Sequence, residues 1–178
     1  MKNNKGFSLV ELIVVIAIMV ILSAVTAAAL ANQPGWKVKN AEEMLRTAIG
    51  ETRMEAMSKH RASLTITKEA DGCYIQITGK EKERLGNSKN IQIFYGVNGG
   101  DVTTELTPGM KLEFSFDRSS GAFTPIINGT DASGNYQYRS QTQGGTSVML
   151  YCTGIAVKCG NSGRELVLVK DTGKYYEK

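Results

Sequence analysis

The chain has 178 residues, of which 21% are charged and 42% hydrophobic, a composition that excludes a disordered or low-complexity protein. The formal net charge is +4, and without Lys2, Lys5 and Glu11 the chain has 19 basic against 16 acidic residues, which gives little support for a polyanionic partner. Three cysteines are too few for a disulfide framework.

The chain opens with a short basic leader and a long apolar segment. Residues 1–6 contain Lys2 and Lys5, and residues 7–31 contain Glu11 as their only charged side chain. As a helix, this segment extends roughly 37 Å at 1.5 Å per residue, which exceeds the ~30 Å hydrocarbon layer of a bilayer. We therefore expect residues 7–31 to form a transmembrane helix, with the basic leader on the cytoplasmic side.

Three ordinary explanations of this segment are incomplete. A removable secretory signal would use the small residues Ala28–Ala31 for cleavage, but the apolar run is longer than such signals require and Glu11 interrupts it. A plain membrane anchor explains the length and leaves the acid unexplained. A buried core helix is improbable because residues 12–25 have no polar face.

The segment KGFSLVELIVVIAIMVIL resembles the signal of type IV pilins and of the pseudopilins of type II secretion. The matching features are a basic leader ending in Gly6, then Phe7, then Glu11, then the apolar run. The resemblance implies that a prepilin peptidase cuts between Gly6 and Phe7 and methylates the new amine of Phe7. It also implies partners: other pilin or pseudopilin subunits and an inner-membrane assembly platform.

Glu11 is the most informative residue of this segment. A carboxylate within a membrane costs ~2.5–3.5 kcal/mol on insertion scales, unless it finds a cation. The resemblance implies that, after processing, the amine of Phe7 is that cation. The amine belongs either to the same chain as Glu11 or to a neighbouring subunit. We therefore expect Glu11 to act in filament assembly and to set the register between subunits.

Residues 32–60 continue as an amphipathic helix after an interruption at Pro34–Gly35. One stripe repeats every three or four positions and indicates a face that packs on a globular domain. Its members are Val38, Ala41, Leu45, Ala48, Ile49, Thr52 and Ala56.

Residues 61–178 have the pattern of a β domain. Strand-length runs are separated by Asp-Gly, Asn-Gly and Pro-Gly turn signals. The runs are SLTIT, CYIQITG, NIQIFYG, MKLEFSFD, SVMLYC, GIAVKC and RELVLVKD. One hairpin is expected through Asp117–Gly121 and another through Thr172-Gly173. The sequence therefore predicts an α+β fold, with a long N-terminal helix packed on an antiparallel sheet.

Two segments of this domain, FDRSSGAFTP and GRELVLVKDTGKYY, are similar to the H-type minor pseudopilin of type II secretion and to FimT-type minor pilins. The matching residues are Phe116, Gly121, Arg164 and Gly173. This resemblance implies a minor subunit that is held in the cytoplasmic membrane with its C-terminal domain outside the cytoplasm, and that reaches the cell surface after assembly.

Catalytic and metal-binding patterns are weak. We expect no enzyme, no cofactor and no metal, because the single histidine, His60, lies near the end of the predicted helix, the sequence has no zinc-ligand spacing, and Asp131–Asn135 lacks most ligands of a calcium loop. For Cys152 and Cys159 two states stay open: a disulfide across a short hairpin or bent strand, or buried thiols.

A group of cations near the C-terminus raises a second function. Lys158, Arg164, Lys170 and Lys174 lie close in sequence, and FimT-like minor pilins take up DNA through basic C-terminal surfaces. DNA binding would need these side chains on one face. The alternative is a solvated sheet face, because Glu165, Asp171 and Glu177 are interspersed.

Overall fold

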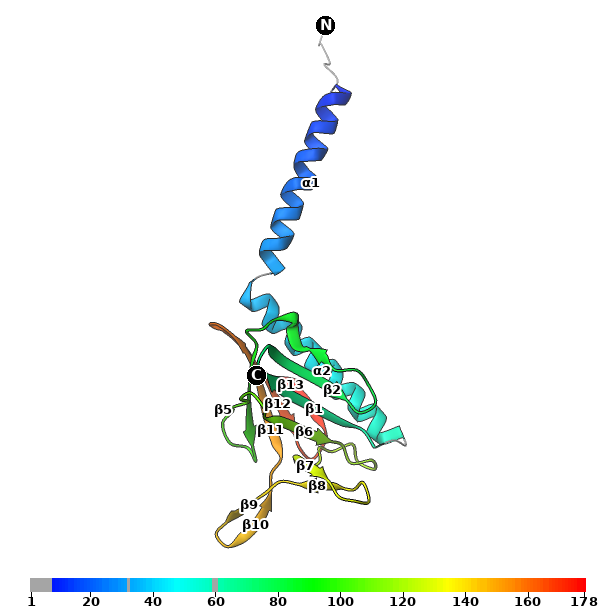
Figure 1. Ribbon diagram of the computed structural model, residues 1–178, viewed down its shortest axis with the longest axis vertical. Coiled ribbons are helices and arrows are strands. Elements are labelled where there is room, and N and C mark those ends of the chain that lie inside the picture. The colour runs from blue at the N-terminus through cyan, green and yellow to red at the C-terminus, as the bar shows by residue number, and fades with distance from the viewer. Residues whose placement is uncertain (1–7, 32, 59–60) are drawn as a thin grey trace.

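The computed structural model describes residues 8–31, 33–58 and 61–178, without the side chains of residues 25–31. In this part of the chain two helices precede a β domain (Figure 1). Helix α1 (Leu9–Ala31) extends away from the domain, and helix α2 (Pro34–Ser58) lies across it. The α+β fold expected from the sequence is confirmed.

The boundary between the helices is set by Pro34. Proline lacks a backbone N–H and suits the first position of a helix, where that group has no intrahelical partner. The interruption predicted at Pro34–Gly35 is confirmed: a new helix begins at Pro34, and Gly35 lies within its first turn.

Helix α2 is held by an apolar face. Every residue of the predicted stripe is buried, from Val38 to Ala56. One further residue of α2, Glu42, is buried and does not belong to the predicted stripe. Its burial needs a charged partner, which the neighbouring sheet supplies.

Two antiparallel sheets pack with α2 around one core. The first has the order β3 (Glu83–Arg84), β2 (Gly72–Ile77), β1 (Ser63–Glu69) and β6 (Lys111–Ser115). The second has the order β13 (Lys174–Glu177), β12 (Ser162–Val169), β11 (Cys152–Cys159), β4 (Gln92–Val97) and β5 (Thr104–Glu105).

The core lies between α2 and these sheets. Alternate residues of each strand face it, as expected for sheets covered on one side. Its fully buried side chains include Leu45, Ile49, Leu64, Ile66, Ile93, Leu112, Phe114, Ile155, Val157 and Leu166.

Two small hairpins and one short 3₁₀ turn complete the domain. The hairpins are β7 (Ile127–Thr130) with β8 (Tyr136–Tyr138), and β9 (Ser140–Gln143) with β10 (Thr146–Met149). The 3₁₀ turn, η1 (Leu85–Asn87), packs on the first turns of α2. The β9–β10 hairpin projects from the end of the domain that lies away from α1 (Figure 1).

Two strand predictions need correction. SVMLYC is not one strand, because Leu150 leaves the β10 ladder to bond with Ile126 and Arg139, and β11 begins at Cys152. The turn expected through Asp117–Gly121 is present, with Asp117 N–H donating to the carbonyl of Ala122 at 2.8 Å, but the strand pairing beside it is limited to a single bridge between Phe116 and Phe123. The hairpin of β12 with β13 is confirmed.

Candidate assembly site

The N-terminal helix begins with a capping serine. The carbonyl oxygen of Ser8 accepts a hydrogen bond from the backbone N–H of Leu12 at 3.1 Å. The Oγ atom of Ser8 accepts a second one from the backbone N–H of Glu11 at 3.4 Å. This is the arrangement of a helix N-cap. Glu11 therefore lies in the first turn, where the helix dipole favours a negative charge.

The described surface of α1 is apolar and uncovered. Its large apolar side chains are all exposed, from 45% at Val15 to 74% at Leu9. Among the described residues no cation forms an ion pair with Glu11. The protein's own domain therefore covers neither the apolar side chains nor the carboxylate of this helix.

Gly6 and Phe7 lie outside the described residues, so cleavage between them and methylation of Phe7 rest on the sequence. Within the described part of the chain, which leaves out the side chains of residues 25–31, no helix is long and apolar enough to cross a membrane.

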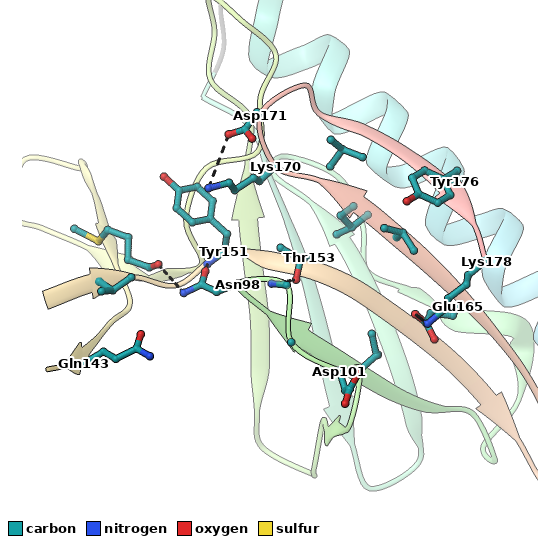
Figure 2. A pocket seen from close by; sticks show the side chains of 18 residues that line it. Asn98, Asp101, Gln143, Tyr151, Thr153, Glu165, Lys170, Asp171, Tyr176 and Lys178 are labelled. Carbon is teal, nitrogen blue, oxygen red and sulfur yellow. Dashed lines mark hydrogen bonds and ion pairs between the residues drawn. The ribbon is translucent and has the colours of Figure 1, made fainter. Parts of the chain in front are cut away.

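A groove with a volume of about 860 Å³ lies on the outer face of the second sheet (Figure 2). Val167, Val169 and Tyr176 lie along the sheet, and the 98–102 loop and the β9–β10 hairpin border it. Asn98 joins the two borders, because it donates to the carbonyl of Met149 at 3.2 Å and its Oδ1 accepts the N–H of Tyr151 at 2.9 Å. No nucleophile–base pair occurs among the lining residues.

The four cations proposed for DNA do not share one face. Arg164 lies on the core side of β12 and pairs with Glu42 of α2 at 3.0 Å. Lys158 and Lys174 lie on the outer side of the sheet. Their partners on β12 are six residues apart, which corresponds to about 20 Å. Lys170 lies over the ring of Tyr151, 5.4 Å from its centroid. The four side chains therefore do not form the single basic surface that DNA binding would need.

The suggested disulfide is also corrected. Cys152 and Cys159 lie at the two ends of β11, which separates them by about 23 Å at 3.3 Å per residue. A disulfide requires Cα atoms within about 7 Å, so these two residues of one chain cannot pair. Both thiols, and that of Cys73, are free and buried, and burial raises the pKa of Cys152 to about 12.

The candidate calcium loop is closed by its own hydrogen bonds. Asp131 Oδ1 accepts the N–H groups of Ser133 and Asn135, at 2.9 and 2.8 Å. These bonds, those of Asn135 first, lower the pKa of Asp131 below its ordinary value. Among the described residues no three His, Cys, Asp or Glu side chains gather as metal ligands. His60 lies outside the described residues.

Two glycines of the H-type resemblance meet in space. Gly121 and Gly173 have positive φ angles of 67° and 64°, and a Cβ on Gly173 would overlap the carbonyl oxygen of Gly121. Arg53 of α2 ties both turns to the helix, donating to the carbonyls of Gly121 at 3.1 Å and Thr172 at 3.0 Å.

Sequence reasoning missed Arg53 and Glu42, the two α2 residues that hold the C-terminal strands. A positive side chain off the apolar stripe looks like any solvated residue. The sequence gives no local signal for the role of Arg53, because the carbonyls that it reaches lie 68 and 119 residues further along the chain.

Comparison with known families gives one match. Residues 1–27 match the prokaryotic N-terminal methylation motif. The motif places this chain among the type IV pilin-like proteins. Such prepilins are anchored in the inner membrane, are processed by prepilin peptidase at this motif and assemble into filaments with other pilins. They are structural subunits and not enzymes. Searches of curated proteins and of solved structures found no match to this pilin-like chain.

Proposed function

We propose that this pilin-like protein is a minor subunit, a minor pilin or pseudopilin, of a type IV pilus or type II secretion filament. The observation that carries the proposal is the position of Glu11 in the first turn of a helix whose large described apolar side chains are all exposed. A surface of this kind is stable when lipid or neighbouring helices cover it.

The two coverings correspond to two stages. Before assembly, residues 7–31 lie in the cytoplasmic membrane as a single pass, with residues 1–6 in the cytoplasm and residues 61–178 outside it. Prepilin peptidase removes residues 1–6 and methylates Phe7. The assembly platform then extracts the subunit, and the apolar surface of α1 packs against the helices of other subunits.

Glu11 links these stages. Cleavage creates an amine at Phe7, one helical turn before the carboxylate. Pairing with this amine, its own or that of a neighbouring subunit, removes the energetic cost of an unpaired intramembrane charge. Where the amine belongs to a neighbouring subunit, the pair also fixes the axial register of the filament, because the amine has one position per subunit.

The minor-subunit assignment is supported by the C-terminal turns. Gly121 and Gly173 are two of the residues that resemble the H-type minor pseudopilin and FimT-type minor pilins, and their close approach gives them a structural reason to be glycine. Arg53 joins this pair to α2. The turns therefore form part of the architecture that positions the β domain on its helix.

DNA uptake is the second candidate function, and the basic residues give it less support. Arg164 is engaged by Glu42 and Glu177, and the remaining cations are spread over the sheet. A duplex needs several cations along one phosphate track. We therefore place assembly before DNA binding.

The test is a Glu11→Gln variant, which keeps the shape of the side chain and removes its charge. We expect cleavage to proceed and incorporation to fall, measured as the fraction of mature chain recovered in sheared filaments. Glu43→Gln is the matched control, because Glu43 is an exposed carboxylate on α2. Incorporation of Glu11→Gln at the level of the control would overturn the proposed role.

A further inference from the structure

The end of the β domain beside the α1–α2 boundary gathers three separate segments. The position of a Cβ on Gly86 in η1 lies 2.9 Å from the carbonyl oxygen of Lys37, so the η1 turn covers the first turn of α2. The position of a Cβ on Gly35 lies 3.9 Å from Oγ of Ser162, so the β11–β12 turn reaches the same place. We call this end the junction face; it is visible in Figure 1 where α2 begins.

The junction face carries an excess of positive charge. Lys89 after η1 and Lys158 before the β11–β12 turn are exposed, and Lys37 of α2 is half-buried. None of the three forms an ion pair with a described residue. The Nζ atom of Lys158 lies over the ring of Phe94, 4.5 Å from its centroid.

Two acids of the segments around this face are engaged by cations of their own. Asp71, on the turn beside η1, pairs with Arg84. Glu69, at the end of β1, pairs with Lys82. Glu105, opposite Phe94 in the β4–β5 register, forms no ion pair with a described residue and offsets part of the charge. The three lysines therefore leave this face with a net positive charge.

An exposed tryptophan lies among these charges. Trp36, in the first turn of α2, has 59% of its surface exposed. Tryptophan is enriched at the headgroup level of membranes, where an apolar ring and a polar N–H meet suitable surroundings. It is also separated from the last residue of the apolar helix α1 by only a few residues.

We propose that the junction face is a second membrane contact, which binds anionic phospholipid headgroups through Lys37, Lys89 and Lys158 with Trp36 at the interface. The inference rests on the proposed function, because the membrane-held subunit brings this face to the bilayer. Lysines within a Debye length of an anionic surface, about 8 Å at physiological salt, are attracted to it. The contact fixes how the domain stands on the membrane before extraction.

Continuity with α1 favours lipid over nucleic acid as the occupant. A duplex on this face would have to fit between the domain and the bilayer into which α1 leads. Headgroups already lie at that position, and their phosphates offer the same charge to the lysines. DNA binding at these residues is thus a distinct result that the test must detect.

Trp36 is the only tryptophan of the chain, so its fluorescence reports this face alone. The full chain is reconstituted in vesicles of phosphatidylcholine, or of phosphatidylcholine mixed with phosphatidylglycerol, each containing brominated lipid as quencher. We expect the phosphatidylglycerol vesicles to give a blue-shifted emission and stronger quenching, and high salt to reverse both changes.

The lysines are tested with two triple variants that each remove three positive charges. Lys37→Gln, Lys89→Gln and Lys158→Gln together should abolish the dependence on phosphatidylglycerol. The matched control combines Arg118→Gln, Lys170→Gln and Lys174→Gln, which lie around the Gly121 and Gly173 turns near the other end of α2. This control should keep the full dependence.

Several results would overturn the inference. One is an equal Trp36 emission and quenching in both kinds of vesicle, and another is an equal loss of the phosphatidylglycerol dependence in both triple variants. The third is the absence of any lipid dependence together with binding of a soluble DNA duplex by the wild type and not by the junction-face variant. Flotation of the vesicles distinguishes a failure of this inference from a failure of the proposed function. A chain that floats without lipid dependence contradicts the junction face alone, and a chain that does not float contradicts the membrane-held subunit itself.

Discussion

Arg164 of β12 and Glu42 of α2 form an ion pair, with Nη1 of the arginine 3.0 Å from Oε2 of the glutamate. The Glu42 side chain is only 2% exposed, and Arg46 is its other partner, at 3.4 Å. Arg164 also contacts Glu177 of β13, at 2.7 Å. One guanidinium thus joins the helix to the last two strands of the second sheet.

Replacing Arg164 with Gln should destabilise the domain. Glu42 would stay buried with a single, more distant partner, so the free energy of unfolding should fall by about 1–3 kcal/mol. Urea unfolding of the full chain in detergent measures this change. Lys174→Gln is the control, and adding Glu42→Gln to Arg164→Gln should recover part of the loss. An unchanged unfolding midpoint for Arg164→Gln would show that the pair does not hold the helix to the sheet.

Substitutions at Gly173 and Gly160 separate backbone strain from close approach. Both glycines have positive φ, 64° and 58°, but only Gly173 meets another backbone, since nothing lies within 4 Å of a Cβ on Gly160. Gly160→Ala should therefore lower the free energy of unfolding by only about 1–2 kcal/mol, which is the cost of the left-handed backbone conformation for a residue with a Cβ. Gly173→Ala should lose more, because the turn must move away from Gly121. Thermal unfolding of the two variants compares them, and equal losses would contradict the close contact of the two turns.

Asp117 predicts a pH dependence. Its Oδ1 accepts the hydroxyl and N–H groups of Ser119 and Ser120, and these bonds, that from the Ser119 hydroxyl first, hold its pKa below the usual value of 3.8. A lowered folded pKa stabilises the protein above the unfolded pKa, and this contribution is lost as the pH falls toward the folded value.

Asp117→Asn should therefore be less stable than the wild type at neutral pH, and the difference should shrink as the pH falls below about 4. Unfolding midpoints measured across this range test the sign. A difference that grows on acidification would contradict the hydrogen-bonded carboxylate.

The helical part of the fold could be predicted because its signal is local. The stripe from Val38 to Ala56 repeats with the helical period, and burial follows that period closely. Pro34 marks the helix start because its missing N–H acts on its own chain. The strands β1, β2, β4, β6 and β12 likewise follow alternating apolar patterns in the sequence.

What the sequence could not predict depends on contacts between distant residues. The burial of Glu42 requires Arg164, 122 residues later, and Arg53 reaches carbonyls in two separate turns. Strand β9 has no apolar alternation, because its sequence SQTQ is polar and exposed on both faces. Cys152 and Cys159 appeared close because their spacing fits a hairpin, whereas one continuous strand separates them.

Thiol chemistry tests that correction. Because burial raises the pKa of Cys152 to about 12, its thiolate is scarce at neutral pH, and alkylation by iodoacetamide should be slow until the chain is unfolded. Peptide mapping before and after reduction should find Cys152 and Cys159 unlinked. A peptide pair joined through these two residues of one chain would contradict the course of β11.

The mass of the mature N-terminus tests the central claim most directly. The filament subunit is isolated from cells that carry prepilin peptidase, and its first peptide is identified by mass spectrometry. The account predicts a chain that begins at Phe7 and carries one added methyl group on its amine. A chain that still begins at Met1, or one that begins at residue 32 after the Ala28–Ala31 segment, would contradict the assignment of this protein as a processed pilin-like subunit.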